Sequence, residues 1–163
     1  MDRRAWLPVG CLAAIASCTT TSPVVLRSTG AGAVAFGASL AETELMVGTK
    51  ASGPGADAAC RYVEFSSLPG LRFTVENGVI TRADAGLGVR NELGVQLGDT
   101  TDSVVALYPD IAVRKSPTSP GGTDLIQADA DGHHAIVLQA AGNKIIAIRA
   151  GLNTSVGPPQ GCP

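Results

Sequence analysis

Aromatic residues and histidines are scarce in this chain. Its 163 residues include one tryptophan, two tyrosines, three phenylalanines and two histidines, and the net charge is −2. Nucleic-acid binding proteins carry basic stripes and aromatic rings for stacking, so this composition excludes that class. The lack of clustered lysine and arginine also excludes docking to a membrane through a polybasic segment. No apolar run reaches the roughly 20 residues that a membrane-spanning helix needs.

Motifs for catalysis are missing as well. There is no G-x-S-x-G sequence, and the glycines at 30, 32 and 37 are followed by neither a βαβ pattern nor a Walker lysine-serine pair. A cysteine–histidine enzyme would need Cys60 or Cys162 as a free thiol. We therefore expect a protein that is not an enzyme and that uses no cofactor.

The N-terminal residues have the layout of a secretory signal peptide. Arg3 and Arg4 precede an apolar run over residues 5–16, which is interrupted by Pro8 and Gly10. A buried N-terminal helix is the alternative, but proline and glycine both disfavour a stable helix. We expect residues 1–17 to be a signal peptide of the lipoprotein type and the protein to be exported.

The end of this run carries a more specific motif. Ile15-Ala16-Ser17-Cys18 resembles the lipobox of bacterial lipoproteins, in which the cysteine is lipidated and becomes the new N-terminus. We therefore predict lipidation of Cys18, a membrane anchor of several acyl chains and a flexible tether over residues 18–31. The alternative is cleavage after Ala16, at an A-x-A site, which would leave a soluble exported chain.

Two cysteines remain once the signal peptide and Cys18 are assigned. In an exported protein, Cys60 and Cys162 are expected to form a disulfide rather than a metal site. Closing a loop of about 100 residues contributes up to about 4.7 kcal/mol in the chain-entropy model, and typical measured values are about 2–4 kcal/mol. The alternative is two unpaired thiols.

A similar pattern occurs twice along the chain. The segments that begin at Gly32 and Leu93 each place a short apolar stretch before a glycine and a helical pattern after it. In the first, Ser39 and Glu42 fit a capping box at the start of the helix. In the second, Asp99 or Thr100 can cap the helix.

Strands follow each predicted helix. Residues 71–76 alternate apolar and polar side chains, as in a half-buried strand, and Asn77-Gly78 favours a two-residue hairpin turn. In the second half, residues 134–150 contain two strand patterns around a tight turn at Gly142-Asn143. The linkers at residues 50–59 and 109–123 are rich in proline, glycine or serine and are expected to be loops.

These patterns predict one α+β domain over residues 32–163. It would consist of two tandem helix-plus-antiparallel-meander repeats, about 32–91 and about 92–163. A repeat of about 60 residues is marginally stable by itself, so we expect the two to share one core.

The repeated unit V-x-x-G-x-[ST]-x-x-E, followed by a helix and strands, is similar to that of SmpA/OmlA-type outer-membrane lipoproteins. It also resembles the tandem-repeat β-lactamase inhibitor proteins. The C-terminal half, with VQLGDTTDSVVALYPD and KIIAIRAG, resembles a group of uncharacterised secreted proteins. The resemblance implies a fold rather than an activity. This chain departs from the pattern because Ser103 replaces the capping-box glutamate, and it lacks the aromatic-rich surface of the inhibitors.

Four polar residues before the strand at 134 are candidate binding residues: Asp129, Asp131, His133 and His134. Adjacent strand residues point to opposite faces, so the two histidines cannot both ligate one metal ion without a turn. A calcium loop would need a glutamate where Leu138 stands. We therefore expect a polar hairpin tip, with Asp131-Gly132 as its turn, and no metal.

Tyr62 and Tyr108 are the other candidate binding residues, because tyrosine is often enriched at binding surfaces. The alternative is that each covers an edge of the core.

The main hypothesis is a non-enzymatic envelope lipoprotein that uses the outer face of its sheet and its loops to bind an unknown envelope protein. It would face the periplasm or the cell surface. A periplasmic small-ligand or cell-wall glycan binder, with its site near residues 129–134, is the alternative. A hydrolase that uses the same groups is a weaker third.

Overall fold

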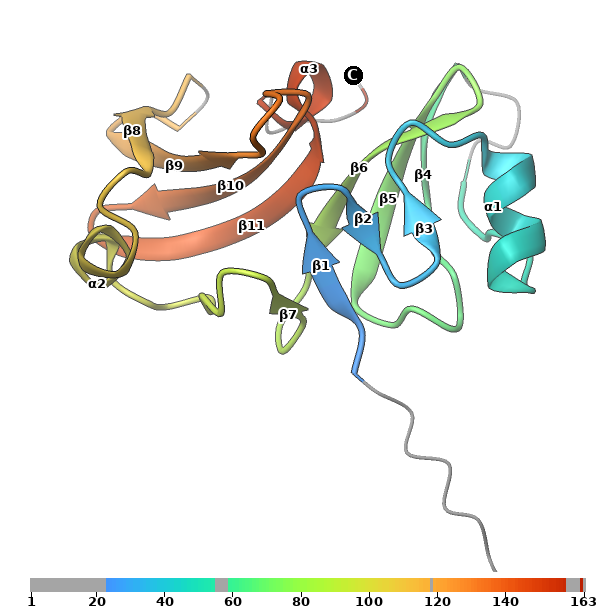
Figure 1. Cartoon of the computed structure of the whole chain (residues 1–163), viewed down its shortest axis with the longest axis horizontal. Helices are drawn as coiled ribbons and strands as arrows, with labels where there is room; N and C mark the ends of the chain where they lie inside the picture. Colours follow the sequence, from blue (N-terminus) through green and yellow to red (C-terminus); the bar gives the residue numbers. More distant parts are fainter. Residues whose placement is uncertain (1–22, 55–58, 118, 158–161, 163) are drawn as a thin grey trace, which may run out of the picture.

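The computed structural model describes residues 23–54, 59–117, 119–157 and 162, which are mainly β-structure (Figure 1). The strands are β1 (Val25–Arg27), β2 (Gly30–Ala31), β3 (Val34–Ala35), β4 (Cys60–Val63), β5 (Leu71–Glu76), β6 (Val79–Ala85), β7 (Arg90–Asn91), β8 (Ala112–Lys115), β9 (Gly122–Ala128), β10 (His134–Ala141) and β11 (Lys144–Leu152). The helices are α1 (Leu40–Val47), α2 (Thr101–Leu107) and α3 (Asn153–Val156).

Seven strands form one antiparallel sheet in the order β4-β5-β6-β11-β10-β9-β8. Strands β4 to β6 come from the first half of the chain and β8 to β11 from the second. The two groups join where β6 pairs with β11 (Figure 1). The sheet therefore has two outer edges, at β4 and at β8.

Both predicted hairpin turns are confirmed. Asn77 and Gly78 have φ values of 50° and 81°, so both residues of the β5–β6 turn are left-handed, as a type I′ turn requires. In the β10–β11 turn, Gly142 has a φ of 58°. Asparagine and glycine adopt such angles at low cost, which explains why these dipeptides could be recognised in the sequence.

The two longer helices begin where their capping residues predicted. Ser39 accepts a hydrogen bond from the amide of Glu42, and the Glu42 carboxylate accepts one from the Ser39 amide in return. This reciprocal pair is the capping box expected from the sequence. Thr100, rather than Asp99, caps α2 and accepts a hydrogen bond from the Ser103 amide at 3.1 Å.

The predicted α+β class is wrong. The helices have eight, seven and four residues, whereas strands dominate the described chain and form a second, four-stranded sheet in the order β3-β2-β1-β7. The fold is therefore mostly β rather than two helix-plus-meander repeats. The sequence analysis missed the second sheet because β2, β3 and β7 have only two residues each, too few for an alternating pattern.

The second sheet also changes the boundary of the predicted tether. Residues 25–31, which the sequence analysis placed in a flexible segment, contribute β1 and β2, and Leu26 and Ala31 are buried. These residues are therefore part of the folded domain. Gly30 and Gly32 belong to a tight β1–β2–β3 meander, in which Gly30 lies against the backbone of Val34.

The main core includes side chains of the large sheet, the small sheet, α1 and α2. Its fully buried side chains include Leu26 from the small sheet and Phe73, Ile80 and Leu138 from the large one. Phe65 packs edge-on against Phe73, with ring centroids 5.5 Å apart. Phe73 lies in the alternating segment 71–76, for which the sequence predicts a half-buried strand, and its side chain is completely buried.

The opposite face of the large sheet is also largely buried, and it combines a small apolar cluster of Ala135, Val137 and Val156 with polar and charged side chains. Arg149 donates hydrogen bonds to the Gln139 side chain at 2.9 Å and to the Val156 carbonyl oxygen in α3 at 2.8 Å. Asp124, fully buried, lies 3.8 Å from Arg149, and its oxygens make no hydrogen bond. Burial lowers the pKa of the Arg149 guanidinium, and the nearby charge of Arg82 adds to the effect. No exposed apolar patch runs across the described part of this face.

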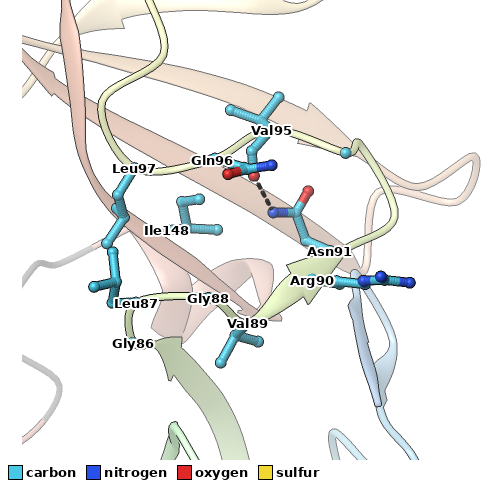
Figure 2. Close-up of a pocket in the computed structure, with 11 residues that line it drawn as sticks. Gly86, Leu87, Gly88, Val89, Arg90, Asn91, Val95, Gln96, Leu97 and Ile148 are labelled. Atoms are coloured by element: carbon cyan, nitrogen blue, oxygen red, sulfur yellow. Dashed lines mark hydrogen bonds between the residues drawn. The ribbon is translucent and has the colours of Figure 1, made fainter. Parts of the chain in front are cut away.

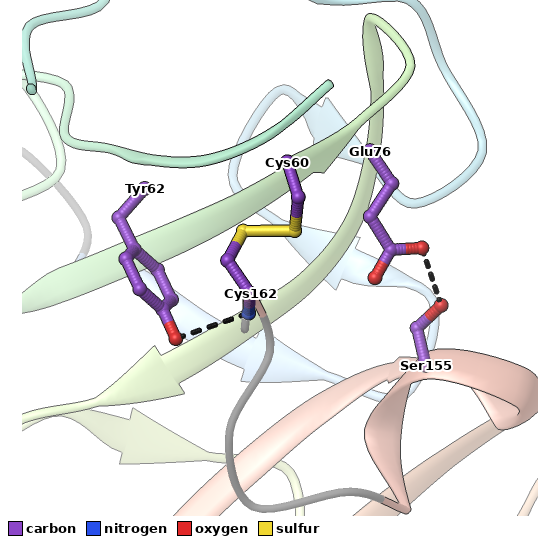
Figure 3. Close-up of a disulfide and its surroundings, with 5 residues drawn as sticks. All are labelled: Cys60, Tyr62, Glu76, Ser155 and Cys162. Atoms are coloured by element: carbon purple, nitrogen blue, oxygen red, sulfur yellow. Dashed lines mark hydrogen bonds between the residues drawn. A yellow bond between two sulfur atoms is a disulfide. The ribbon is translucent and has the colours of Figure 1, made fainter. Parts of the chain in front are cut away.

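The predicted disulfide is confirmed between Cys60 and Cys162 (Figure 3). It joins the first residue of β4 to the C-terminal end of the chain across a sequence separation of 102 residues. Next to it, the amide of Cys162 donates a hydrogen bond to the Tyr62 hydroxyl at 3.2 Å. Ser155 in α3 donates one to Glu76 at 3.1 Å. The C-terminal end is thus fixed to the strands of the first half.

The junction between β6 and β11 needs a residue without a side chain. Gly151 pairs with Arg82, and a Cβ atom at position 151 would lie 2.3 Å from the carbonyl oxygen of Thr81. Neighbouring backbone cannot give way as a flexible side chain can. Gly151 therefore allows the close approach that turns two groups of strands into one sheet.

We predict that Gly151→Ala lowers the free energy of unfolding by about 1–3 kcal/mol, because the added methyl group forces the two strands apart. Urea unfolding followed by circular dichroism measures this. The matched control is Gly157→Ala, since a Cβ there meets only the end of the Arg114 side chain, at 3.6 Å. Equal stability of the two variants would show that the junction does not depend on glycine.

Candidate functional site

The structure brings three of the four predicted polar residues together at the β9–β10 turn. One ligating atom each of Asp129, Asp131 and His134 lies within 4.8 Å of the others. His133 does not join them: its side chain is exposed, and its carbonyl oxygen accepts a hydrogen bond from the Asn153 amide at 2.8 Å. The predicted hairpin tip therefore exists, with Gly132 in its turn at a φ of 73°.

Most of the polar atoms in this cluster bond with one another. One Asp129 oxygen accepts a hydrogen bond from the His134 amide at 3.0 Å, and the other lies 2.8 Å from His134 Nδ1. Asp131 accepts a hydrogen bond from the His133 amide at 3.1 Å. The hydrogen bond from the His134 amide is the main cause that lowers the pKa of Asp129. The arrangement holds the turn in shape.

The two tyrosines serve other parts of the fold. The Tyr62 ring lies beneath the Arg72 guanidinium, with 4.6 Å between the guanidinium carbon and the ring centroid, beside the disulfide (Figure 3). Tyr108 ends α2, and its hydroxyl donates a hydrogen bond to the Leu93 carbonyl oxygen at 2.6 Å. Both are partly buried, and the structure does not bring either into a common site with residues 129–134.

A cavity of 420 Å³ lies where the loop between β6 and β7 approaches β11 (Figure 2). Its walls include Leu87, Val95 and Ile148. Asn91 is buried, but its side chain is used by the loop itself, through hydrogen bonds with the Val95 carbonyl oxygen and the Leu93 amide. The volume suits a small ligand, yet the buried side-chain amide of Asn91 already makes hydrogen bonds within the loop. The sequence analysis did not predict this cavity.

The edge of the large sheet at β8 is the part that is most exposed to solvent. All four residues of this strand, from Ala112 to Lys115, are exposed. The Ser116 amide donates a hydrogen bond to the Gly122 carbonyl oxygen, so residues 116 and 122 form a hydrogen-bonded pair that continues the β8–β9 ladder. Hydrogen-bonded and non-bonded pairs alternate along an antiparallel ladder. The backbone N–H and C=O groups of Val113 and Lys115 therefore point away from β9, toward the open edge.

A groove of 490 Å³ runs beside this edge, between β8, β9 and α2. Val113 and Leu125 line it from the sheet, and Val105 and Ala106 line it from the helix. Val105 and Val113 are both large apolar side chains that are exposed to solvent. The edge strand thus combines free backbone groups with an adjoining apolar surface.

The other edge of the sheet is partly covered. Ser52 and Glu64 exchange two backbone hydrogen bonds, of 2.9 and 2.7 Å, directly after β4. The disulfide fixes the start of the same strand. Among the described residues, β8 therefore differs from β4 in having no such cover. The sequence predicts a loop over residues 109–123, because four strand residues among prolines, serines and glycines leave no readable alternation.

The site and fold define a mostly β protein with an open sheet edge and no recognisable catalytic set in its described residues. No family model and no curated protein matches the chain. Among solved structures, the crystal structure of the uncharacterized protein YfeY from Escherichia coli is similar, with 12% identity and a TM-score of 0.48. The match covers 78% of this chain and 99% of that one. No comparison shows the lipoprotein or inhibitor families that the sequence motifs resemble. None of the described helices is long and apolar enough to cross a membrane.

We predict that Asp129→Asn destabilises the protein at neutral pH and that this difference disappears in acid. The pKa of Asp129 is lower in the folded chain than in the unfolded one. Its stabilising effect is therefore complete above the unfolded value of about 3.9 and is lost as the pH falls through the folded value. Urea midpoints at several pH values measure this, with the exposed Asp110→Asn as the control. A difference that persists unchanged in acid would contradict the assignment.

Proposed function

We propose that this protein is a non-enzymatic interaction module of the bacterial cell envelope. It binds an extended segment of another envelope protein, which adds as a further strand to the edge of the large sheet at β8. The open backbone groups of Val113 and Lys115 carry this proposal, since main-chain hydrogen bonds supply the affinity in such strand addition. The proposed mechanism includes no chemical step.

The apolar groove beside β8 supports selectivity in this binding. In an added strand, alternate side chains point to the same face of the sheet. Those on the α2 side would lie over Val113 and Val105, which line the groove. Apolar residues at every second position of the partner segment are therefore expected.

Charge gives a second criterion for the partner. Arg114 and Lys115 make half of the strand basic, and both are exposed. Basic residues on an edge strand discourage unselective pairing with other edges, and they favour a segment that carries acidic residues. We therefore infer a partner segment with alternating apolar residues and acidic neighbours.

The cellular location of the protein is part of the proposal. The disulfide is consistent with an exported protein, because such bonds persist in oxidising compartments. Cys18 lies outside the described residues, and its lipidation is supported by the motif at residues 15–18. A lipid anchor there would hold the module at a membrane surface facing the periplasm or the cell exterior.

The alternative of a small-ligand or glycan binder near residues 129–134 has weaker support. The carboxylates of Asp129 and Asp131 accept hydrogen bonds from the backbone of their own turn. A ligand would have to compete with these contacts. At β8, in contrast, a partner would meet backbone groups that face solvent.

Site-specific crosslinking tests the β8 edge. We predict that a photoreactive residue at Lys115, in the full chain expressed in a bacterial host, forms a discrete crosslink to another protein. Val113→Pro should abolish it, because proline removes an outward N–H but leaves the β8–β9 hydrogen bonds intact.

Two controls make this result specific. Val113→Thr keeps the N–H and the branched shape, so its crosslink should remain. A photoreactive residue at Leu45, which is exposed on α1, should not give the same product. Crosslinking at Lys115 that is insensitive to Val113→Pro, in a variant with an unchanged melting temperature, would contradict strand addition.

Lipidation has its own test. We predict that the chain from a lipoprotein-processing host begins at an acylated Cys18 and sediments with membranes, because several acyl chains give stable anchoring. Cys18→Ser should move the protein to the soluble fraction. Intact mass spectrometry and membrane fractionation measure both. A soluble wild-type chain that begins at Ser17 would instead support cleavage after Ala16.

A further inference from the structure

The loop between β6 and β7 exposes a leucine more fully than any other large apolar side chain of the described residues. Leu87 is 88% exposed and stands between Gly86 and Gly88. Nothing in the described part of the chain covers it. Contact of this side chain with an apolar phase outside the folded chain would be favourable, because it withdraws apolar surface from water.

This loop lies beside the point where the described chain begins. Residues 25 and 90 are partners in the parallel pairing of β1 with β7 (Figure 1). A cavity of 280 Å³ is shared between Pro23 and Val24 on one side and the loop on the other. The surface that these segments form is here termed the tether face, and its residues are Pro23, Val24, Pro69, Leu87, Val89 and Arg90.

The number of residues before Pro23 limits how far this face can be from a lipid anchor. Cys18 is five residues from Pro23, and five residues span at most about 18 Å when fully extended. That distance is less than the thickness of one bilayer core, which is about 30 Å. An anchor at Cys18 therefore keeps the tether face within reach of the membrane.

The charge next to Leu87 fits a lipid surface. Arg90 is exposed directly after the loop, at the start of β7, and Arg27 is exposed at the end of the neighbouring strand β1. The two acidic residues nearest to Leu87 in the sequence have partners: Asp84 pairs with Arg82, and Glu92 accepts a hydrogen bond from the Ser28 amide at 2.8 Å. An apolar tip with basic neighbours is the combination by which proteins bind the interface of anionic membranes.

We propose that the tether face rests on the bilayer that holds the anchor, with Leu87 inserted among the lipid headgroups. This inference rests on the proposed lipidation of Cys18. It adds an orientation: the lipid fixes one face of the domain against the membrane. In Figure 1 β8 lies at the far end of the large sheet from the point where the chain emerges, so its edge stays accessible to a partner.

A fluorophore at position 87 tests this. Leu87→Cys introduces a thiol into a mature chain whose other cysteines are the acylated Cys18 and the disulfide pair. The acylated, labelled protein is reconstituted into vesicles of phosphatidylethanolamine and phosphatidylglycerol. The matched control is Leu45→Cys on α1, where the leucine is 83% exposed. Flotation first establishes that each protein is bound to the vesicles.

We expect a blue-shifted emission at position 87 and quenching by brominated lipid that is severalfold stronger than at position 45. Vesicle-bound protein with equal quenching at both positions would overturn the orientation and leave the anchor intact. Protein that does not float would refute the anchor, and the orientation with it. A shift at position 87 that appears only after another envelope protein is added would make the tether face a protein contact instead.

Discussion

Pairing of β6 with β11 is the interaction on which the rest of the structure depends. It joins strands from the two halves of the chain into one sheet of seven, and Gly151 makes it possible because no side chain fits there. The junction buries apolar residues on one face and places Arg82 and Arg149 on the other. Both arginines are nearly fully buried, so the sheet has a second interior beneath α3, which combines these charged groups with the apolar side chains of Ala135, Val137 and Val156.

The large sheet has two edge strands, β4 and β8, and the surroundings of these two strands differ. At the β4 edge, residue 52 makes backbone hydrogen bonds with Glu64 directly after the strand, and the disulfide fixes the start of the strand. The edge at β8 is left open next to an apolar groove. Open edges carry a risk of aggregation, which the basic residues of β8 reduce. The same groups would make the edge selective for an acidic, extended segment.

The two proposed surfaces use different parts of the fold. The tether face gathers the start of the described chain and the β6–β7 loop, whereas β8 lies at the other end of the large sheet (Figure 1). A module anchored through the first could bind through the second without competition between lipid and partner. The lipid anchor would then confine the domain to the membrane, and contact of the tether face with the bilayer would orient it. Strand addition at β8 would bind the partner.

Local signals in the sequence determined the parts that depend on neighbouring residues. The capping box at Ser39 and the turn at Asn77-Gly78 follow from short-range hydrogen bonds and backbone angles, and both were predicted. The disulfide followed from the number of cysteines in a chain that is expected to be exported. Outside the two hairpins, tertiary structure decided which strands pair. The two-residue strands of the small sheet and the four-residue edge strand β8 are too short to show an alternating pattern, and β7 pairs with β1, which is distant in the sequence. No local pattern could therefore reveal them. For the same reason the open edge and the exposed Leu87 acquire their meaning only from what the folded chain places beside them.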